Sequence, residues 1–283
     1  MLPQSRVIFA RNSTLTDYSR ELSDLEEGGV ALSIAHATDA LYIGSDMPFN
    51  HRHLQLALAN KNTVAGSISV EIWDGSAWRA AVNVLDLTSV SGVPFSRAGT
   101  ILWTASRSYE WARQCSTEDM GASEPLSAIK IYDKFWARLK FSADFAFTLD
   151  YVGHKFSKDS DLRTYYSDLD RDEVREAFFG EPTENFDALH IAAAGELIRD
   201  LRARQVIWSG NQILEPDQFR DAGSHKVAEI VYSPGGLNRP EHRDAAVEKY
   251  AESMDKLNFK VDKAGTGKIE PWQAIPVSRV RRR

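Results

Sequence analysis

GSISVEIWDGSAWRAAV, residues 66–82, is the stretch that decides the fold class of the first half of the chain. Its apolar residues alternate with polar ones, so that Ile68, Val70 and Ile72 share one face of an extended strand. The Asp-Gly pair at residues 74–75 is typical of a hairpin turn. We therefore predict an antiparallel β-hairpin with one apolar face.

The register of this hairpin follows from which side chains would face one another across it. A three-residue loop, residues 74–76, places Ile72 opposite Trp78 on the apolar face. On the other face the same register places Glu71 opposite Arg79, which is a favourable pair of opposite charges. We therefore expect Trp78 to lie in the core.

Trp73, which directly precedes the turn, has two interpretations. It is either a partly covered residue at the rim of the sheet or an exposed ring that could contact a ligand. A carbohydrate-binding module would need Trp73, Tyr42 and Trp103 to lie exposed in one plane. The sequence leaves both interpretations open.

The same period of two continues from residue 29 to about residue 151, with Gly, Asn, Asp and Ser at the turns. In KFWARLKFS, residues 134–142, four alternate side chains share one face: Phe135, Ala137, Leu139 and Phe141. The number of such segments is sufficient for two packed antiparallel sheets. We expect a β-sandwich, with a closed barrel as the alternative.

Beyond about residue 156 the apolar residues recur at steps of three and four, which is the period of helices. A short helix is expected within residues 168–180, and three longer ones within residues 184–207, 215–232 and 238–257. The apolar stripe of the last helix consists of Val247, Tyr250, Met254 and Leu257.

The sequence thus predicts an α+β protein of two domains. Residues 1–155 form an antiparallel β-sandwich domain, residues 156–260 form a small α-helical bundle, and residues 261–283 form an extended C-terminal tail. A chain of 283 residues is long enough for each domain to bury its own core.

Composition and charge narrow the classes of function. A net charge of -6 argues against a surface built to neutralise nucleic-acid phosphate. The single cysteine, Cys115, excludes an intrachain disulfide and a cysteine-rich zinc site, and we expect an ordinary free thiol. No apolar run has the length of a signal-peptide core or a spanning helix. We expect neither export by a signal peptide nor embedding in a membrane.

Two motifs resemble ion or phosphate sites but lack essential positions. Asp168, Asp170 and Asp172 resemble the start of a calcium loop, yet Glu173 replaces the required glycine and Phe179 the bidentate acid. The GTGK sequence at the start of the tail lacks the upstream glycine of a phosphate-binding loop. We interpret the first as helix capping and the second as a turn.

Histidines give no clear catalytic or metal site. His51 and His53 lie on the same side of a predicted strand, which suits a metal, but no third ligand is identifiable. His190 and His225 lie within predicted helices, where we expect packed or hydrogen-bonded core residues. No Ser-His-Asp order and no zinc-protease motif occurs. We therefore expect no enzyme, no metal and no cofactor.

Two groups of arginines are candidate contact residues. Arg199, Arg202 and Arg204 occupy a charged helix surface that is either a solvated face or, in an oligomer, an interface or channel lining. The tail combines two apolar anchors with four arginines: Trp272, Ile275, Arg279, Arg281, Arg282 and Arg283. Such a tail either remains disordered or docks on another protein or on DNA phosphate.

The helical half resembles the head-to-tail connector (adaptor) proteins of tailed bacteriophages. The residues that carry the resemblance are DLRTYYSDLDRDEVREAFFG, FDALHIAAAGELIRDLRARQVIW, FRDAGSHKVAEIVY and AAVEKYAESMDKLNFKVDKAGTGKIE. The β half is similar to sandwich domains fused to such connectors in some phage neck proteins, through LYIGSDMPFNHRHLQLALAN and VEIWDGSAWRAAVNVLDLT. The resemblance extends from about residue 41 to residue 270.

This resemblance implies a structural role in the virion. Copies of the chain would form a homo-oligomeric ring, expected to hold about twelve copies, beneath the portal protein of the head. The tail segment would dock on the portal, a tail-side neck or tail terminator protein would bind below, and genomic DNA would pass through without sequence-specific binding. Assembly would take place in the host cytoplasm, and the mature location would be the neck of the virion.

The minimal adaptors lack the β domain, so the resemblance assigns it no role. We expect it to brace the outside of the neck. Two other classes of function remain as alternatives. One is the carbohydrate-binding β-sandwich of a phage tail or neck, and the other is a glycoside hydrolase with two carboxylates facing each other across a cleft.

Overall fold

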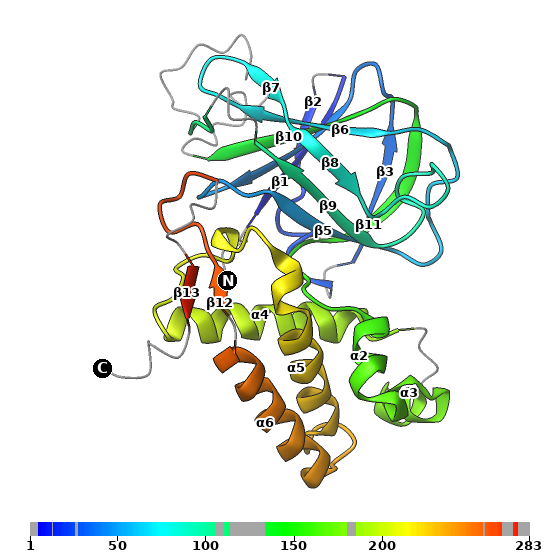
Figure 1. Cartoon of the computed structure of the whole chain (residues 1–283). Coiled ribbons are helices and arrows are strands. Elements are labelled where there is room, and N and C mark those ends of the chain that lie inside the picture. Colours follow the sequence, from blue (N-terminus) through cyan, green and yellow to red (C-terminus); the bar gives the residue numbers. More distant parts are fainter. Residues whose placement is uncertain are drawn as a thin grey trace. The chain divides into compact units, whose positions relative to one another are not determined.

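The computed structural model describes residues 5–12, 14–25, 28–105, 110–113, 134–179, 185–256, 258–267 and 274–276. Within these residues the chain is mixed α+β, as predicted, with two larger antiparallel sheets and five α-helices (Figure 1). The chain divides into two compact units. We call residues 1–153 with 264–268 the β unit, and residues 154–263 with 269–283 the helical unit.

Two antiparallel sheets make up the β unit. The first has six strands, in the order β2 (Thr14–Asp17), β1 (Arg6–Arg11), β4 (Ala40–Ser45), β10 (Phe135–Phe141), β6 (Ile68–Trp73) and β7 (Trp78–Ala80). The second has five strands, in the order β3 (Val30–Ile34), β11 (Phe145–Gly153), β5 (His51–Leu56), β9 (Gly99–Thr104) and β8 (Val82–Asp86). Buried side chains of both sheets form one hydrophobic core, an arrangement that fits a β-sandwich.

The alternation of apolar and polar residues in the sequence determines which face of the six-stranded sheet is buried in the core. Ile68, Val70 and Ile72 of β6 are buried in the core, while Ser69 between them is exposed. The predicted face of β10 is also confirmed, because all four of its side chains contact the same core. Burial of alternate apolar side chains on each strand therefore orients this sheet.

The predicted register of the hairpin is wrong by one residue. In the structure Trp73 pairs with Trp78 and Ile72 pairs with Arg79, so the loop has four residues, 74–77. The cause is Asp74, whose carboxylate accepts hydrogen bonds from the backbone N–H groups of residues 76 and 77 and from Arg79 Nε. A one-residue change in register exchanges the two faces, so Trp78 lies on the outer face of the sheet.

The outer face of the six-stranded sheet carries a second apolar cluster, which the sequence did not indicate. Its buried members are Ile8, Ala10, Ala40, Tyr42, Trp73 and Trp136. Trp136 of β10 faces Gly44 of β4, where an added Cβ would lie only 2.6 Å from the indole ring. Gly44 therefore provides the space in which Trp136 lies flat against the sheet.

The helical unit contains shorter and longer helices in alternation with loops. Its elements are α2 (Asp159–Tyr165), η2 (Ser167–Asp170), α3 (Asp172–Phe179), α4 (Asp187–Ala203), η3 (Gly210–Gln212), η4 (Pro216–Phe219), α5 (Arg220–Tyr232) and α6 (Pro240–Lys256), with β12 (Asn258–Lys260) and β13 (Ala274–Pro276). The three longer helices agree with the prediction, whereas α2 was not predicted. α5 and α6 pack along each other, and α4 packs against α5.

The apolar stripe of α6 differs from the prediction by one position. Tyr250 and Met254 are buried as expected, but their partner one turn earlier is Ala246, and Val247 is 41% exposed. Ala246, Tyr250 and Met254 recur at steps of four, which keeps them on one side of the helix. Val247 lies about 100° further round the axis and faces away from this core.

Candidate functional site

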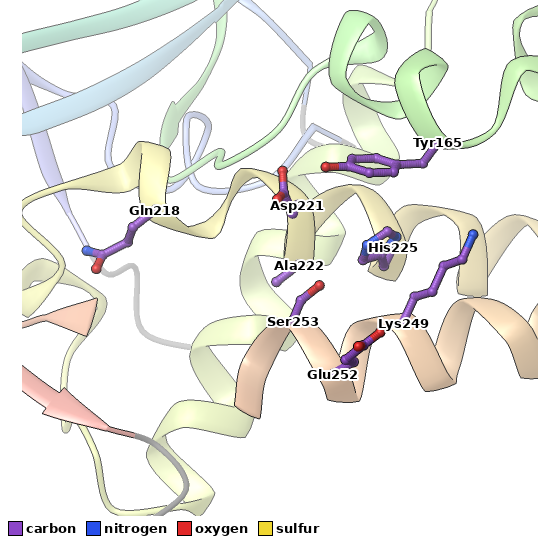
Figure 2. Close-up of a pocket in the computed structure, with 8 residues that line it drawn as sticks. All are labelled: Tyr165, Gln218, Asp221, Ala222, His225, Lys249, Glu252 and Ser253. Carbon is purple, nitrogen blue, oxygen red and sulfur yellow. The ribbon is translucent and has the colours of Figure 1, made fainter. Parts of the chain in front are cut away.

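A recess of about 400 Å³ lies between α2, α5 and α6 of the helical unit (Figure 2). Its polar lining combines acidic, basic and hydroxyl groups: Tyr165 from α2, Asp221 and His225 from α5, and Lys249, Glu252 and Ser253 from α6. α5 and α6 run side by side here, so residues from different turns of both helices face the same space.

His225 is the most buried titratable side chain of this recess. Its Nδ1 lies 3.0 Å from the hydroxyl of Tyr166, and its ring lies 4.8 Å from that of Tyr165. Burial lowers the pKa of His225, and the nearby ammonium of Lys249 lowers it further, although Asp221 opposes this. The imidazole is therefore neutral at pH 7, and its ring nitrogens can donate or accept a hydrogen bond.

Hydrogen bonds also join a serine, a histidine and an aspartate, although the sequence shows no Ser-His-Asp order. Ser157 Oγ lies 2.7 Å from His190 Nδ1, and His190 Nε2 lies 3.1 Å from Asp159 Oδ1. These are the residue types of a hydrolytic triad. Two of the three side chains are buried, however, with His190 fully covered.

The packing around this chain of hydrogen bonds indicates a structural role. An added Cβ on Gly223 of α5 would lie 2.8 Å from Ser157 Oγ, so α5 covers the hydroxyl where a substrate would have to approach. Asp159 also accepts a hydrogen bond from the backbone N–H of Phe186, directly before α4. The network joins the start of α2 to α4, and His190 is a hydrogen-bonded core residue as predicted.

A second, open recess of about 610 Å³ lies where α4, α5 and α6 meet. Carboxylates from each helix line it: Glu196, Glu229 and Asp244, together with Arg243, Ile230 and Val247. Lys226 of α5 binds two of these carboxylates, at 3.2 Å from Glu196 and 3.0 Å from Glu229. We call this surface the acidic recess.

Arg199 and Arg202 of α4 and Arg204 directly after it do not form one surface. Arg199 and Arg202 are exposed, whereas Arg204 is half-buried with Nη1 4.0 Å from Asp255 Oδ1 of α6. Arg202 Nε donates a hydrogen bond to the backbone carbonyl of Trp208 at 2.7 Å. Arg202 therefore supports the loop after α4.

That loop contains two residues that the sequence analysis missed. Trp208 is 60% exposed, and Gln212 is fully buried. Gln212 Oε1 accepts a hydrogen bond from Trp208 N at 2.7 Å, and Nε2 donates one to the carbonyl of Asp262 at 2.9 Å. Asp262 N in turn donates to the carbonyl of Gln212 at 2.9 Å. Gln212 thus ties this loop to the segment that follows β12, a contact over 50 residues that no local pattern indicates.

Of the predicted tail residues, the structure describes only Ile275. It lies in β13 and pairs with Phe259 of β12 in a two-stranded antiparallel sheet. Trp272, Arg279 and residues 281–283 lie outside the described residues, as does Cys115.

The aromatic side chains proposed for a carbohydrate-binding surface are buried. Trp73 is 1% exposed, so neither the exposed ring nor the partly covered rim position is correct, and Tyr42 and Trp103 are buried as well. Trp103 belongs to the core between the sheets, whereas Trp73 and Tyr42 belong to the outer cluster. The three rings therefore form no common exposed plane.

The aspartate and glycine residues that were compared with calcium and phosphate loops have roles in the fold. Asp168 accepts a hydrogen bond from the hydroxyl of Tyr232 at 2.8 Å, which joins η2 to α5. Gly265 and Gly267 have φ of 69° and 74°, values that favour glycine in a turn. Within the described residues no group of three or more His, Cys, Asp or Glu side chains is placed to hold a metal ion.

His51 and His53 are buried in β5 beside Arg52. His53 Nε2 lies 3.1 Å from Gln55 Oε1, and His51 Nδ1 lies 3.0 Å from Asn50 Oδ1. Burial lowers the pKa of His51 to about 3, with further contributions from the charges of Arg52 and His53.

We predict that the β unit loses stability in acid because of His51. The folded protein keeps this imidazole neutral, so the unfolded chain, with a pKa near 6.5, binds the proton first as the pH falls. Between pH 8 and pH 5 this linkage costs about 2 kcal/mol of unfolding free energy. Urea titrations at both pH values will measure it. His51→Gln should show a smaller loss, and an equal loss in both proteins would contradict the prediction.

No helix of the described part of the chain combines the length and the apolar character needed to cross a membrane. No protein-family model matches the chain, and no curated protein matches it. Among solved structures, the chain is similar to a "Family 89 Glycoside Hydrolase from Clostridium perfringens in complex with 2-acetamido-1,2-dideoxynojirmycin", at 8% identity and a TM-score of 0.29. The match covers 77% of this chain and 21% of that one, so the chain spans about a fifth of that protein. At this TM-score the likeness carries no argument about function.

Proposed function

We propose that this chain is a structural virion protein that forms a ring between the portal of a phage head and the tail. The observation that carries the proposal is the order of elements in the helical unit. A long helix, α4, is followed by the α5–α6 pair and then by a segment that turns into strand β12, the order that the resemblance to connector proteins implies. The proposal assigns the chain no catalytic activity.

We further propose that the two units are separate domains with different tasks. Residues 1–155 would be a β-sandwich domain that braces the outside of the neck, residues 156–260 the ring-forming bundle, and residues 261–283 the portal-docking tail. The burial of Trp73 and Tyr42 supports bracing over sugar binding, because aromatic stacking on a sugar needs an exposed ring face.

The net charge also supports a ring around DNA. A chain with a net charge of -6 suits a channel in which DNA must slide, because tight phosphate binding would hold the DNA back. Partners would be further copies of the chain, the portal and a tail-side neck or tail terminator protein.

Deleting residues 271–283 is expected to abolish binding to the portal, because the proposal assigns the docking contacts to this tail. Native mass spectrometry of the protein with and without purified portal will measure the complex. The far-ultraviolet spectrum and thermal midpoint of the deletion variant serve as controls for folding. Undiminished portal binding by the folded variant, or a full-length protein that remains monomeric with portal present, would contradict the proposal.

A further inference from the structure

β8 is the last strand of the five-stranded sheet: it pairs with β9 on one side, and within the described residues no strand pairs with its other edge (Figure 1). Leu87 N donates to the carbonyl of Thr100 at 3.0 Å. Leu85 pairs with Leu102, so Leu85 and Leu87 both direct their backbone groups toward β9. Asp86, between them, therefore directs its N–H and C=O groups to the open edge, where a strand from another chain can pair with them.

The exposed face of β8 is apolar. Val82 is 41%, Leu85 53% and Leu87 40% exposed, and all three share one face, because they lie opposite alternate residues of β9. Edge strands usually carry charged side chains that prevent pairing with other chains. The one charged residue of β8 is Asp86, and its carboxylate accepts hydrogen bonds from the N–H and the hydroxyl of Thr88, at 2.8 and 2.6 Å. This edge therefore lacks the usual protection against an added strand.

Two loops beside β8 extend the apolar surface. Asn62 N donates to the carbonyl of Phe95 at 3.0 Å, which holds the loop after β5 against the loop after β8. The first loop exposes Val64, at 45%, and the second exposes Val90, at 46%. The apolar surface of β8 therefore continues onto its neighbouring loops.

Charged residues are few in this part of the β unit. Residues 57–70 and 81–104 contain only three, Lys61, Asp86 and Arg97. Such depletion of charge is typical of the centre of a protein–protein interface. Arg97 Nε donates to the carbonyl of Leu87 at 2.9 Å, which places this arginine at the end of β8. Lys61 and Arg97 are both exposed, and in the part of the chain that the structure describes neither has a carboxylate partner.

These two cations indicate the kind of partner. Carboxylates complement them, whereas further cations would be repelled. A second copy of the chain, paired through the same edge, would bring Lys61 and Arg97 into the contact again. The C-terminal tail carries four arginines, so its charge does not match either. The surface therefore favours an extended segment of a different protein that combines apolar side chains with carboxylates.

We propose that the open edge of β8 binds an extended, acidic segment of another protein by strand addition. Asp86 supplies the backbone hydrogen bonds, Leu85 and Leu87 contact apolar side chains of the segment, and Arg97 binds a carboxylate. The inference rests on the bracing role proposed for the β unit and deepens it, since it names the surface and the kind of partner.

Binding of synthetic peptides to the full-length protein tests this contact. The probes are two fluorescent peptides with blocked ends, EETVTVTVEE and KKTVTVTVKK, which differ only in the charges at their ends. Anisotropy at physiological salt, where the net charge of the protein is screened, should show the glutamate peptide binding at least about ten-fold more tightly. Arg97→Glu should reverse this order.

A second substitution tests the apolar part of the contact. Leu85→Asn removes apolar surface without adding charge and should weaken binding of the glutamate peptide about ten-fold. The matched control is Val247→Asn, which changes a 41% exposed side chain of α6 and should leave peptide binding unchanged. Circular dichroism will confirm that each variant is folded.

Hydrogen exchange distinguishes strand addition from a contact of side chains alone. The peptide should slow exchange at the amide of Asp86, whose N–H points to the open edge. At a peptide concentration ten times the Kd, we expect exchange at this amide to be about ten-fold slower.

The inference would be overturned by a glutamate peptide that does not bind, by equal binding of the two peptides, or by an Asp86 amide that gains no protection. Binding to anionic lipid vesicles in place of the peptide would overturn it as well, as would self-association of the protein alone that Leu85→Asn abolishes. Portal binding is measured separately. A ring that binds the portal would leave the proposed function standing even if the peptides do not bind.

Discussion

Replacing Trp136 by alanine is expected to lower the unfolding free energy of the β unit by about 3–5 kcal/mol. The indole is fully buried on the outer face of the six-stranded sheet, in a cluster with Trp73 and Tyr42. Gly44 on the neighbouring strand leaves the space that the ring fills, so its removal opens a large cavity. Urea denaturation followed by circular dichroism will measure the change.

The matched control for Trp136 is an exposed apolar side chain of the same unit. Leu58→Ala removes a side chain that is 54% exposed and should change stability by less than about 0.5 kcal/mol. A small effect of Trp136→Ala would show that the outer cluster is not packed. The interpretation of Trp73 as a ring that contacts a ligand would then have to be tested again.

Gln212→Ala is expected to destabilise the helical unit by about 2–4 kcal/mol. Its amide joins the backbone N–H of Trp208 to the carbonyl of Asp262, and both Gln212 and Asp262 are fully buried. Truncation leaves these backbone groups without their partner in an environment that water reaches poorly. Hydrogen exchange should be faster at the amides of Trp208 and Ser209, which both donate to Gln212 Oε1, in addition to the lower stability.

Gln218→Ala provides the comparison for this prediction. The amide of Gln218 also donates to a backbone carbonyl, that of Glu215 at 2.8 Å, but it does so at the surface. We expect a change within about 0.5 kcal/mol. Equal effects of the two substitutions would mean that Gln212 does not connect the α4 loop to the segment after β12.

Local patterns were sufficient for most of the elements and their faces, although they missed β1, β2 and α2. The alternation of Ile68, Val70 and Ile72 predicted the inner face of β6, because a strand places every second side chain on the same side. Steps of three and four likewise located α4 and α5. The same reasoning placed Val247 on the buried side of α6, and it was wrong because Ala246 is small enough to pack there instead.

The candidate sites depended on contacts that no local pattern contains. Ser157 and His190 are 33 residues apart, and Tyr166 and His225 are 59 apart, so only the packing of helices brings each pair together. Trp208 carried no signal of its own, because its exposure depends on buried Gln212 and on Arg202 of the preceding helix.

The sequence by itself determined the α+β class, the position of most strands and of the longer helices, and the absence of an intrachain disulfide. These properties depend on residue type and on periods of two or 3.6, which act within a few residues. Tertiary structure decided the hairpin register, the burial of Trp73 and the exposure of Trp208 and Val247. The contacts concerned join different elements: Arg79 of β7 bonds to Asp74, Trp136 of β10 packs over Gly44 of β4, and Gln212 bonds to the segment after β12.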